Sequence, residues 1–378
     1  MISRVIWASV LLFSSTCTGR GATYYVSSSQ GRETNDGLSE RSAWRTIAQV
    51  NRHEFQPGDT IRLRRGDSWS DTLRLRSSGK RGRPIIVTGY GYGVRPIISG
   101  AAIAIDNNEQ SHIVYDGLEL KTAQQGLRLY SWRANVENIT LQNSVVTIQP
   151  AETSPRLSAA VYANTNSGRF TQIVLRNNFF YPYAAGLENW GVYFVNGVSH
   201  FRIEGNFFSA AGEDAITIWH GTDGVIARNR GGGNGENTID VKDSQNIVIR
   251  NNTAVNDGEY NIVVHQVDPS PRAQDIVIRS NYCIGGGQRG SLTAGIALLG
   301  VRSSMVVANH VQKSTGAAIL VNDSGHAGLA SSQPTTRLAM TNEVRGNFLR
   351  HNGTRLKLPA IVVQGSPGTS LTNNYVDP

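Results

Sequence analysis

Hydrophobic and polar residues alternate in short runs along most of this chain, and many of the runs end in asparagine. Such alternation predicts half-buried β-strands. Asparagine tolerates left-handed turn conformations and hydrogen-bonds locally, which suits a sharp turn at a strand end. These asparagines recur at intervals of 23 to 38 residues, at Asn143, Asn178, Asn206, Asn229, Asn252, Asn281, Asn309, Asn347 and Asn374. The spacing indicates stacked units that each contain short strands and a turn.

The clearest repeat lies between Gly212 and Gln266. One motif, a glycine and a glutamate followed by a predicted strand, begins at Gly212, Gly235 and Gly258. Each copy starts 23 residues after the previous one. Residues 23 apart become neighbours if the units stack. We therefore expect one column of carboxylates from the three copies, formed by Glu213, Glu236 and Glu259.

Strand alternation assigns the side chains of these three units to two faces. We expect an inward face of Ile216, Ile218, Ile239, Val241, Ile262 and Val264. We expect an outward face of Thr217, Asp240, Val263, Trp219, Lys242 and His265. The preceding unit has Tyr193 and Val195 at the outward positions, and the following one has Ala297 and Leu299. Polar outward chemistry is therefore confined to the middle units, where successive rungs lie about 4.8 Å apart.

The N-terminal part of the mature chain differs from this pattern. We expect a strand at 23–26, an amphipathic helix at 42–51 capped by Ser42, and a strand at 60–63. A coil of stacked strands needs its open end covered, and the helix is suited to that task. We divide the chain into 1–22, 23–83 with the strand and capping helix, and 84–378 with the stacked coils.

Residues 1–22 have the features of a secretory signal peptide. Arg4 precedes an apolar run from Val5 to Phe13, and small residues lead to Ala22. The run is too short for a permanent membrane anchor. We expect a bacterial protein that is secreted or periplasmic, and Cys283, which would remain after cleavage, to be a buried free thiol.

The chain of 378 residues has a net charge of +8, and its cations are mostly arginine, with lysine at only five positions. A basic protein favours polyanionic partners. An exported protein rarely meets nucleic acid, so we expect an acidic polysaccharide substrate, no nucleic-acid partner and a monomer.

The coils and the asparagine column together resemble the right-handed parallel β-helix of pectate-lyase-like proteins, over nearly the whole mature chain. The resemblance implies an all-β fold: a single-stranded right-handed parallel β-helix with three short strands per coil, an asparagine ladder and an N-terminal helical cap.

Two segments carry a narrower resemblance. Residues 213–219 resemble the Asp-Asp-Gly-Phe-Asp-Leu-Trp motif of family-nine pectate lyases, which implies calcium ligands at Glu213 and Asp214 and a lysine base on a later coil. Thr217 replaces the third aspartate of that motif, and Glu236 or Asp240 would substitute. Residues 236–265 resemble the lysine and histidine motifs of family-six lyases, which include chondroitinase B and alginate lyases.

These resemblances imply β-elimination on a uronic-acid polymer. Calcium held by Glu213, Asp214, Glu236 and Asp240 would neutralise the uronate carboxylate, and oxygen ligands suit calcium. Lys242 would remove the C5 proton, and His265 or water would protonate the leaving oxygen. Asp240 and Asp243 would raise the pKa of Lys242 unless a metal consumed their charge. The expected substrate-binding residues are Trp219, Arg228, Arg230, Trp190 and Arg272.

Other interpretations remain open at this stage. A glycoside hydrolase would use two carboxylates such as Asp214 and Asp240, and a uronate epimerase would share the abstraction of the C5 proton. A non-catalytic glycan-binding protein would need only the aromatic residues. The glutamate column is also compatible with a solvated turn edge, and Lys242 with a surface ion pair to Asp240 or Asp243.

Overall fold

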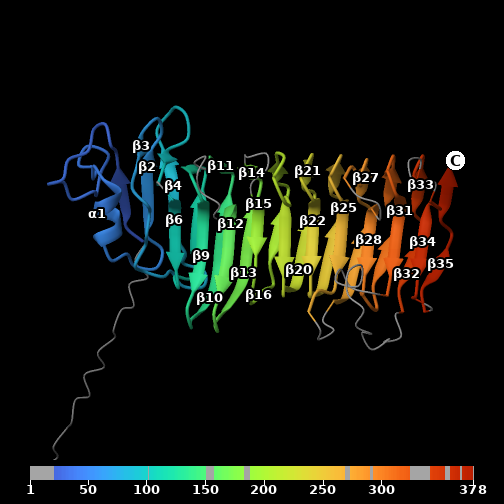
Figure 1. Ribbon diagram of the computed structural model, residues 1–378. Helices are drawn as coiled ribbons and strands as arrows, with labels where there is room; N and C mark the ends of the chain where they lie inside the picture. The colour runs from blue at the N-terminus through green and yellow to red at the C-terminus, as the bar shows by residue number, and fades with distance from the viewer. Residues whose placement is uncertain are drawn as a thin grey trace, which may run out of the picture.

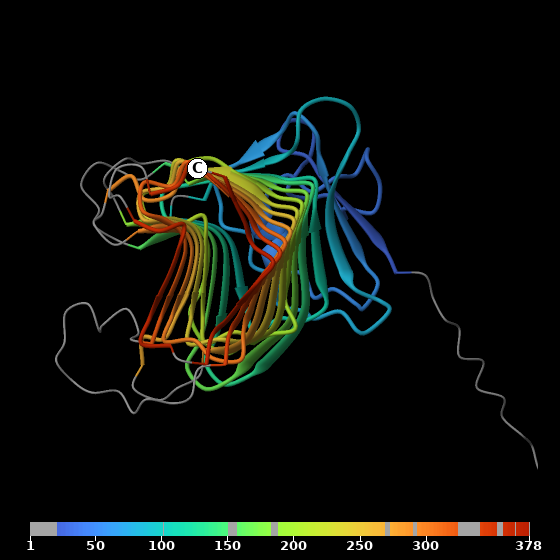
Figure 2. The same ribbon diagram turned by 90° about the vertical axis from the view of Figure 1, so that its right-hand side faces the viewer.

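The computed structural model describes residues 21–100, 102–149, 157–182, 188–268, 273–289, 293–323, 341–353, 358–366 and 368–377. Each turn of the chain contributes one strand to each of three parallel sheets, which we name A, B and C. The strands stack side by side along the molecule, and the three sheets form the sides of the coil when it is viewed end-on (Figures 1 and 2). This arrangement confirms the predicted all-β parallel β-helix.

The bounds of the strands follow the chain three at a time over most of the coil. Sheet A contains β1 (Thr23–Val26), β2 (Thr60–Arg64), β4 (Ile85–Tyr90), β7 (Ile113–Asp116), β10 (Asn135–Gln142), β13 (Arg169–Arg176), β16 (Val198–Ser199), β17 (Arg202–Glu204), β20 (Thr222–Ala227), β23 (Gln245–Arg250), β26 (Gln274–Arg279), β29 (Met305–Val307), β32 (Glu343–Arg345) and β35 (Ser370–Thr372). Sheet B contains β3 (Ser68–Trp69), β5 (Ile97–Ile98), β8 (Glu119–Thr122), β11 (Val145–Ile148), β14 (Phe179–Pro182), β18 (Phe207–Phe208), β21 (Arg230–Gly232), β24 (Thr253–Val255), β27 (Tyr282–Ile284), β30 (His310–Gln312), β33 (Phe348–Arg350) and β36 (Tyr375–Asp377). Sheet C contains β6 (Ile103–Asn108), β9 (Gln125–Ser131), β12 (Ser158–Thr165), β15 (Asn189–Phe194), β19 (Ile216–Trp219), β22 (Asn237–Lys242), β25 (Tyr260–His265), β28 (Ala294–Leu299), β31 (Ala317–Asn322) and β34 (Ile361–Gln364).

The inward side chains of all three sheets meet in one continuous apolar core. In sheet C, Ile216, Ile239, Ile262 and Ile296 pair rung to rung and are fully buried. The predicted inward face of the three repeated units is therefore confirmed, and alternation works because each strand buries only one of its faces in this core.

The asparagine ladder is present at the turn between sheets A and B, but it starts later than predicted. The Nδ2 of Asn178 donates to the Oδ1 of Asn206 at 3.0 Å, and the same contact repeats up to Asn374. Asn143 is not a member, because Ser144 takes the ladder position in that coil and its backbone amide donates to the Oδ1 of Asn178. The left-handed conformation belongs to the residue before each ladder asparagine, such as Asn177 or Arg228.

The N-terminal helix is shorter than predicted. Helix α1 spans Ile47–Arg52, and Thr46 precedes it as the N-cap in place of Ser42, with the Thr46 amide donating to Gln49. Its apolar face joins the core of the coil at the N-terminal end (Figure 1), as expected of a cap. Sheet pairing already includes β1 and β2, and β2 pairs with β4, so it runs across the boundary predicted at residue 84.

The signal peptide is predicted over residues 1–22, and residues 1–20 of this range lie outside the described residues. Cys283 is a buried free cysteine, as expected. Within the part of the chain that is described, no helix has the length and apolar character needed to span a membrane.

Candidate functional site

The outer face of sheet C carries the predicted polar cluster in the predicted register. Thr217 pairs with Asp240, and Trp219 pairs with Lys242. Lys242 pairs in turn with His265 on the next rung. This face is not a solvated surface, because Asp240 and His265 are only 2% and 4% exposed. The charged groups of this cluster are therefore largely withdrawn from water.

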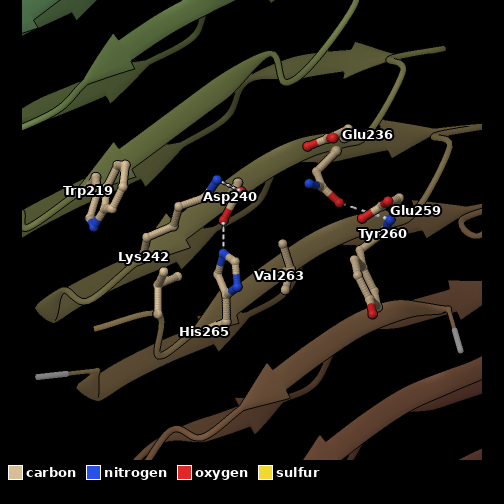
Figure 3. Close-up of a pocket in the computed structure, with 10 residues that line it drawn as sticks. Trp219, Glu236, Asp240, Lys242, Glu259, Tyr260, Val263 and His265 are labelled. Atoms are coloured by element: carbon tan, nitrogen blue, oxygen red, sulfur yellow. Dashed lines mark hydrogen bonds and ion pairs between the residues drawn. The ribbon is translucent and has the colours of Figure 1, made fainter. Parts of the chain in front are cut away.

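Asp240 lies at the centre of a triad with Lys242 and His265. One carboxylate oxygen accepts from the Nε2 of His265 at 2.8 Å, and the other lies 3.0 Å from the Nζ of Lys242 (Figure 3). The Lys242 ammonium also lies 6.0 Å from the centre of the Trp219 ring. The three side chains of the triad come from two neighbouring strands, β22 and β25, so the rung spacing of the sheet fixes their separation.

The triad determines the ionisation of its members. Burial alone would raise the pKa of Asp240, but His265 and Lys242 outweigh burial and hold this pKa at about 2. Burial would lower the pKa of Lys242, but Asp240, Asp214 and Glu236 outweigh it and raise this pKa above the ordinary lysine value. Asp240 is therefore an anion and Lys242 a cation at neutral pH. The predicted role of Lys242 as a base conflicts with this charge state.

A pocket of about 170 Å³ opens beside the triad. Its walls come from neighbouring rungs of sheet C and the turns before them (Figure 3). The lining residues are Trp219, Glu236, Asn237, Asp240, Lys242, Glu259, Tyr260, Val263, His265 and Val267. The pocket thus combines a large aromatic ring, a cation, a histidine and several carboxyl groups.

The glutamate column forms as predicted. The Glu236 amide donates to the carbonyl of Glu213 at 3.0 Å, and the Glu259 amide donates to the carbonyl of Glu236 at 2.9 Å. Burial, followed by the charges of Asp214, Glu213 and Glu259, raises the pKa of Glu236 to about 8. Glu236 is therefore the carboxyl group of the pocket that keeps its proton at neutral pH.

Asp214 is a buried carboxyl group behind the pocket. It accepts from the Oγ1 of Thr217 at 2.7 Å and from the backbone and side-chain amides of Asn237 at 3.0 and 2.8 Å. Burial and the charge of Asp240 raise the pKa of Asp214 to about 7. Thr217, which stands where the resembled motif has an aspartate, is thus a hydrogen-bond donor to Asp214.

The predicted calcium ligands do not fit a metal in this arrangement. Both oxygens of Asp214 and both oxygens of Asp240 already accept hydrogen bonds or ion pairs. Glu236 forms a side-chain hydrogen bond with Glu213. We therefore derive no step through calcium.

A separate group of possible metal ligands lies behind Trp219. Among the described residues, one group has its ligand atoms within 4.8 Å of one another, namely His220, Asp243 and Asp268. The Oδ2 of Asp243 accepts from Trp219, and its Oδ1 accepts from two backbone amides of the following turn. The Nε2 of His220 contacts Asp268 at 2.8 Å. These contacts hold the Trp219 ring in place and account for Asp243 without a metal.

The predicted substrate-binding residues do not all gather at the pocket. Trp219 lines it. Trp190 stacks on Tyr193 with ring centres 4.6 Å apart, one coil before Trp219 on the same face. Arg228 and Arg230 lie at the turn between sheets A and B, on another side of the coil. Arg272 lies outside the described residues.

Three pocket residues, Asn237, Tyr260 and Val267, are not among the residues predicted from the sequence. Asn237 and Tyr260 pair rung to rung and line the pocket together with Asp240. Simple alternation places them on the inward face with Ile239, but the alternation breaks at Thr238 and Asn261, which turn to bind the buried Asp257. The strand pattern does not predict this break in alternation. The one indication in the sequence is a polar residue, Asn237, at a position expected to be in the core.

Comparison with known proteins supports the fold. A family described as "Right handed beta helix region" matches residues 125–290. A lacto-N-biosidase from Bifidobacterium longum is 32% identical over 103 residues, which cover 26% of this chain and only 6% of that protein. The chain therefore corresponds to a small part of this relative's length.

Solved structures with the same architecture are carbohydrate-active enzymes. A GH136 lacto-N-biosidase from Eubacterium ramulus aligns with a TM-score of 0.67 and 15% identity, over 94% of this chain and 68% of that one. The mannuronan C-5 epimerase AlgE4 A-module of Azotobacter vinelandii aligns with a TM-score of 0.60 and 15% identity, over 84% of this chain and 86% of that one. A mannuronic-acid-specific family 6 polysaccharide lyase from human gut microbiota aligns with a TM-score of 0.56 and 15% identity, over 88% of this chain and 74% of that one. The chain thus has the right-handed parallel β-helix fold that a hydrolase, an epimerase and a lyase share.

Proposed function

We propose that this protein is an exported carbohydrate-active enzyme that cleaves an acidic polysaccharide by β-elimination in the pocket on sheet C. The observation that carries the proposal is the Lys242 ammonium, held by the ionised Asp240 at the wall of a pocket that also contains Trp219. A fixed cation beside an aromatic ring suits a sugar that bears a carboxylate. The fold is compatible with this activity, since a lyase is among the proteins that share it.

In this proposal, Lys242 supplies charge and not a base. The C5 proton of a uronate becomes acidic when the negative charge that develops on its carboxylate is stabilised. An ammonium that is already in place stabilises that charge without reorganisation. The raised pKa of Lys242, which follows from Asp240, Asp214 and Glu236 outweighing burial, keeps the group charged throughout the reaction.

His265 is the base in this scheme. Its Nε2 contacts Asp240 at 2.8 Å, and its side chain lines the pocket. Imidazole is the side chain that most often serves as a general base. The Asp240 anion stabilises the imidazolium that forms when His265 accepts a proton. Asp240 therefore positions both His265 and Lys242.

Glu236 is the general acid. The pKa of about 8, which burial and the neighbouring carboxylates produce, leaves this group protonated at neutral pH. The C5 proton moves to His265, the electron pair forms the C4–C5 double bond, and the C4–O4 bond breaks. The departing oxygen then takes the proton of Glu236. The products are an unsaturated uronate end and a new reducing-end fragment.

The test is to incubate the purified protein with polymannuronate, polyguluronate and polygalacturonate and to follow the ultraviolet absorbance of the unsaturated product. We expect Glu236→Gln and His265→Asn to lower the rate by at least about 10²-fold. Lys242→Arg retains the charge and should keep part of the activity, whereas Lys242→Met should lose it. Equal inactivity of both Lys242 variants, with folded coils, would restore lysine as a base and contradict the charge role.

A glycoside hydrolase is the second candidate, because two carboxyl groups of one pocket have pKa values pushed far apart. Glu236 at about 8 suits a proton donor, and Asp240 at about 2 suits an anion that stabilises positive charge. The lacto-N-biosidase relative and the solved GH136 lacto-N-biosidase agree with this chemistry. New reducing ends without ultraviolet absorbance, lost in Glu236→Gln, would select hydrolysis over elimination.

A further inference from the structure

The arginines that do not reach the pocket form a surface of their own. On the outer face of sheet A, one column of paired positions runs through Arg176, Glu204, Ala227, Arg250 and Arg279. Each of these positions is at or near the carboxyl end of its strand, just before the asparagine ladder. Rungs about 4.8 Å apart therefore bring Arg250 and Arg279 side by side.

Three further arginines widen this column. Arg202 lies two residues before Glu204 on β17, Arg228 lies in the turn and Arg230 starts β21 on sheet B. We name the set of Arg176, Arg202, Arg228, Arg230, Arg250 and Arg279 the arginine stripe. All members are exposed except Arg250, which is partly buried.

Positive charge in the stripe exceeds the negative charge that contacts it. Glu204 lies 2.7 Å from Arg202, 3.3 Å from Arg228 and 3.9 Å from Arg250, so one carboxylate serves three guanidinium groups. Within the described residues, the guanidinium groups of Arg230 and Arg279 have no hydrogen-bond or ion-pair partner. The acids on the same strands, Asp223 and Asp275, lie near the opposite ends of β20 and β26.

An aromatic column lies beside the stripe on sheet B. Tyr282, His310, Phe348 and Tyr375 lie on successive rungs with ring centres 4.7 to 4.9 Å apart. Tyr282, Phe348 and Tyr375 keep exposed surface, at 38%, 36% and 57%. The guanidinium groups of the stripe are thus the charged part of an edge that also presents aromatic surface.

We propose that the arginine stripe is a second binding site, which holds a linear polysaccharide bearing carboxylates along the axis of the coil. The argument is charge complementarity and shape. Guanidinium groups bind carboxylates through paired hydrogen bonds, and cations that recur on every rung from β13 to β26 match an extended polyanion better than a compact one. The choice of a glycan over other polyanions rests on the proposed function.

The site is distinct from the pocket because it lies on another side of the coil. The stripe occupies the edge between sheets A and B, whereas the pocket lies on sheet C. A long chain bound at the stripe raises the local concentration of its other segments at the pocket. The stripe should therefore lower KM for long chains and leave kcat and the turnover of short oligosaccharides unchanged.

The experiment compares the double variant Arg250→Glu/Arg279→Glu with Arg41→Glu/Arg81→Glu, two exposed arginines of the N-terminal region that give the same change of net charge. Full-length mature protein is passed through gels containing polygalacturonate or polymannuronate, so that binding is measured independently of cleavage. We expect the stripe variant to bind roughly tenfold more weakly and the control variant to bind as the parent does. Circular dichroism checks that the coil is retained, and Arg250→Gln/Arg279→Gln serves if charge reversal unfolds it.

The outcomes separate the two proposals. Weaker binding of the stripe variant with normal cleavage of short oligosaccharides supports the stripe as a second site. Equal weakening in both double variants would show a general charge effect and overturn it. Stripe-dependent binding of duplex DNA or of anionic phospholipid vesicles that matches or exceeds binding of the glycans would overturn the assignment of the ligand. Stripe-dependent glycan binding without any cleavage would retain the stripe and reject the proposed activity.

Discussion

Two stretches of the outer face of sheet C share one backbone and differ in chemistry. In β22 and β25 the outward positions hold Asp240, Lys242 and His265, whereas one coil later, in β28, the same register holds Ala297 and Leu299. The apolar stretch forms a second hydrophobic cluster outside the main core. Both stretches are mostly buried. Burial on this face is therefore general, and what distinguishes the pocket is that its charges compensate one another.

The comparison shows how a repetitive scaffold accommodates a site. The backbone hydrogen bonds of each rung are satisfied by the rungs on either side, so a rung tolerates polar outward side chains if they find partners on neighbouring rungs. Asp240 satisfies this condition for Lys242 and His265 at once. The predictions below remove the compensation on one stretch or the packing on the other.

Asp240→Ala should have the largest effect. It leaves Lys242 and His265 buried without their anion, and breaking a buried pair in this way costs about 3–5 kcal/mol. Urea unfolding should show a decrease of this size in the free energy of unfolding. The double variant Asp240→Ala/Lys242→Met should recover part of the decrease, because the unpaired cation is gone. A loss below about 1 kcal/mol would contradict the view that the triad is a compensated buried unit.

Leu299→Ala tests the apolar stretch. Leu299 is 2% exposed and packs in the outer cluster with Val263 and Ala297. Truncation creates a cavity, and we expect a loss of roughly 2–3 kcal/mol in the free energy of unfolding. Activity at the pocket should be retained, since Leu299 does not line it. A neutral effect on unfolding would mean that the outer cluster does not stabilise the coil.

The stability should depend on pH through Asp214. Burial and Asp240 raise the pKa of Asp214 from 3.8 to about 7, so between these values the folded protein binds a proton more tightly than the unfolded chain does. The free energy of unfolding should therefore fall as pH rises through this window, by at most about 1.4 kcal/mol per pH unit. Asp214→Asn should flatten this slope in urea titrations; an unchanged slope would assign it to other groups.

The catalytic proposal predicts a pH dependence of rate that follows Glu236. The rate should fall as pH rises above about 8, where Glu236 loses its proton. Replacing Glu213 with glutamine removes a neighbouring charge and should move this limb to lower pH. The shift is read from kcat against pH; an unmoved limb would mean that Glu236 is not the acid.

Thr217→Val should have the smallest effect. The variant keeps the shape of the side chain but removes the donor to Asp214 at 2.7 Å. We expect a loss of about 1 kcal/mol and a further rise in the pKa of Asp214, because a hydrogen bond to its charged form is lost. Thr217→Ser retains the hydroxyl and is the matched control. If the pKa of Asp214 is the same in both variants, the hydroxyl of residue 217 does not influence the ionisation of Asp214.

Much of the fold could be predicted because a coil repeats itself. The period of 23 residues, the alternation and the turn asparagines each indicate the same unit, so the register of Trp219, Lys242 and His265 follows from their spacing along the chain. Local signals were less secure. Asn143 fits the sequence pattern but is not part of the ladder, because Ser144 occupies the ladder position in that coil.

The sequence by itself determined which residues become neighbours, because stacking converts a fixed spacing along the chain into contact. The tertiary structure decided what those neighbours do. The neighbours His265 and Lys242 keep Asp240 an anion against burial, and Asp240 keeps Lys242 a cation, whereas burial and nearby carboxylates make Glu236 a proton carrier. The three flat sides of the coil also decided that Arg228 and Arg230 lie far from the pocket around the coil, which their proximity to Trp219 in the sequence conceals.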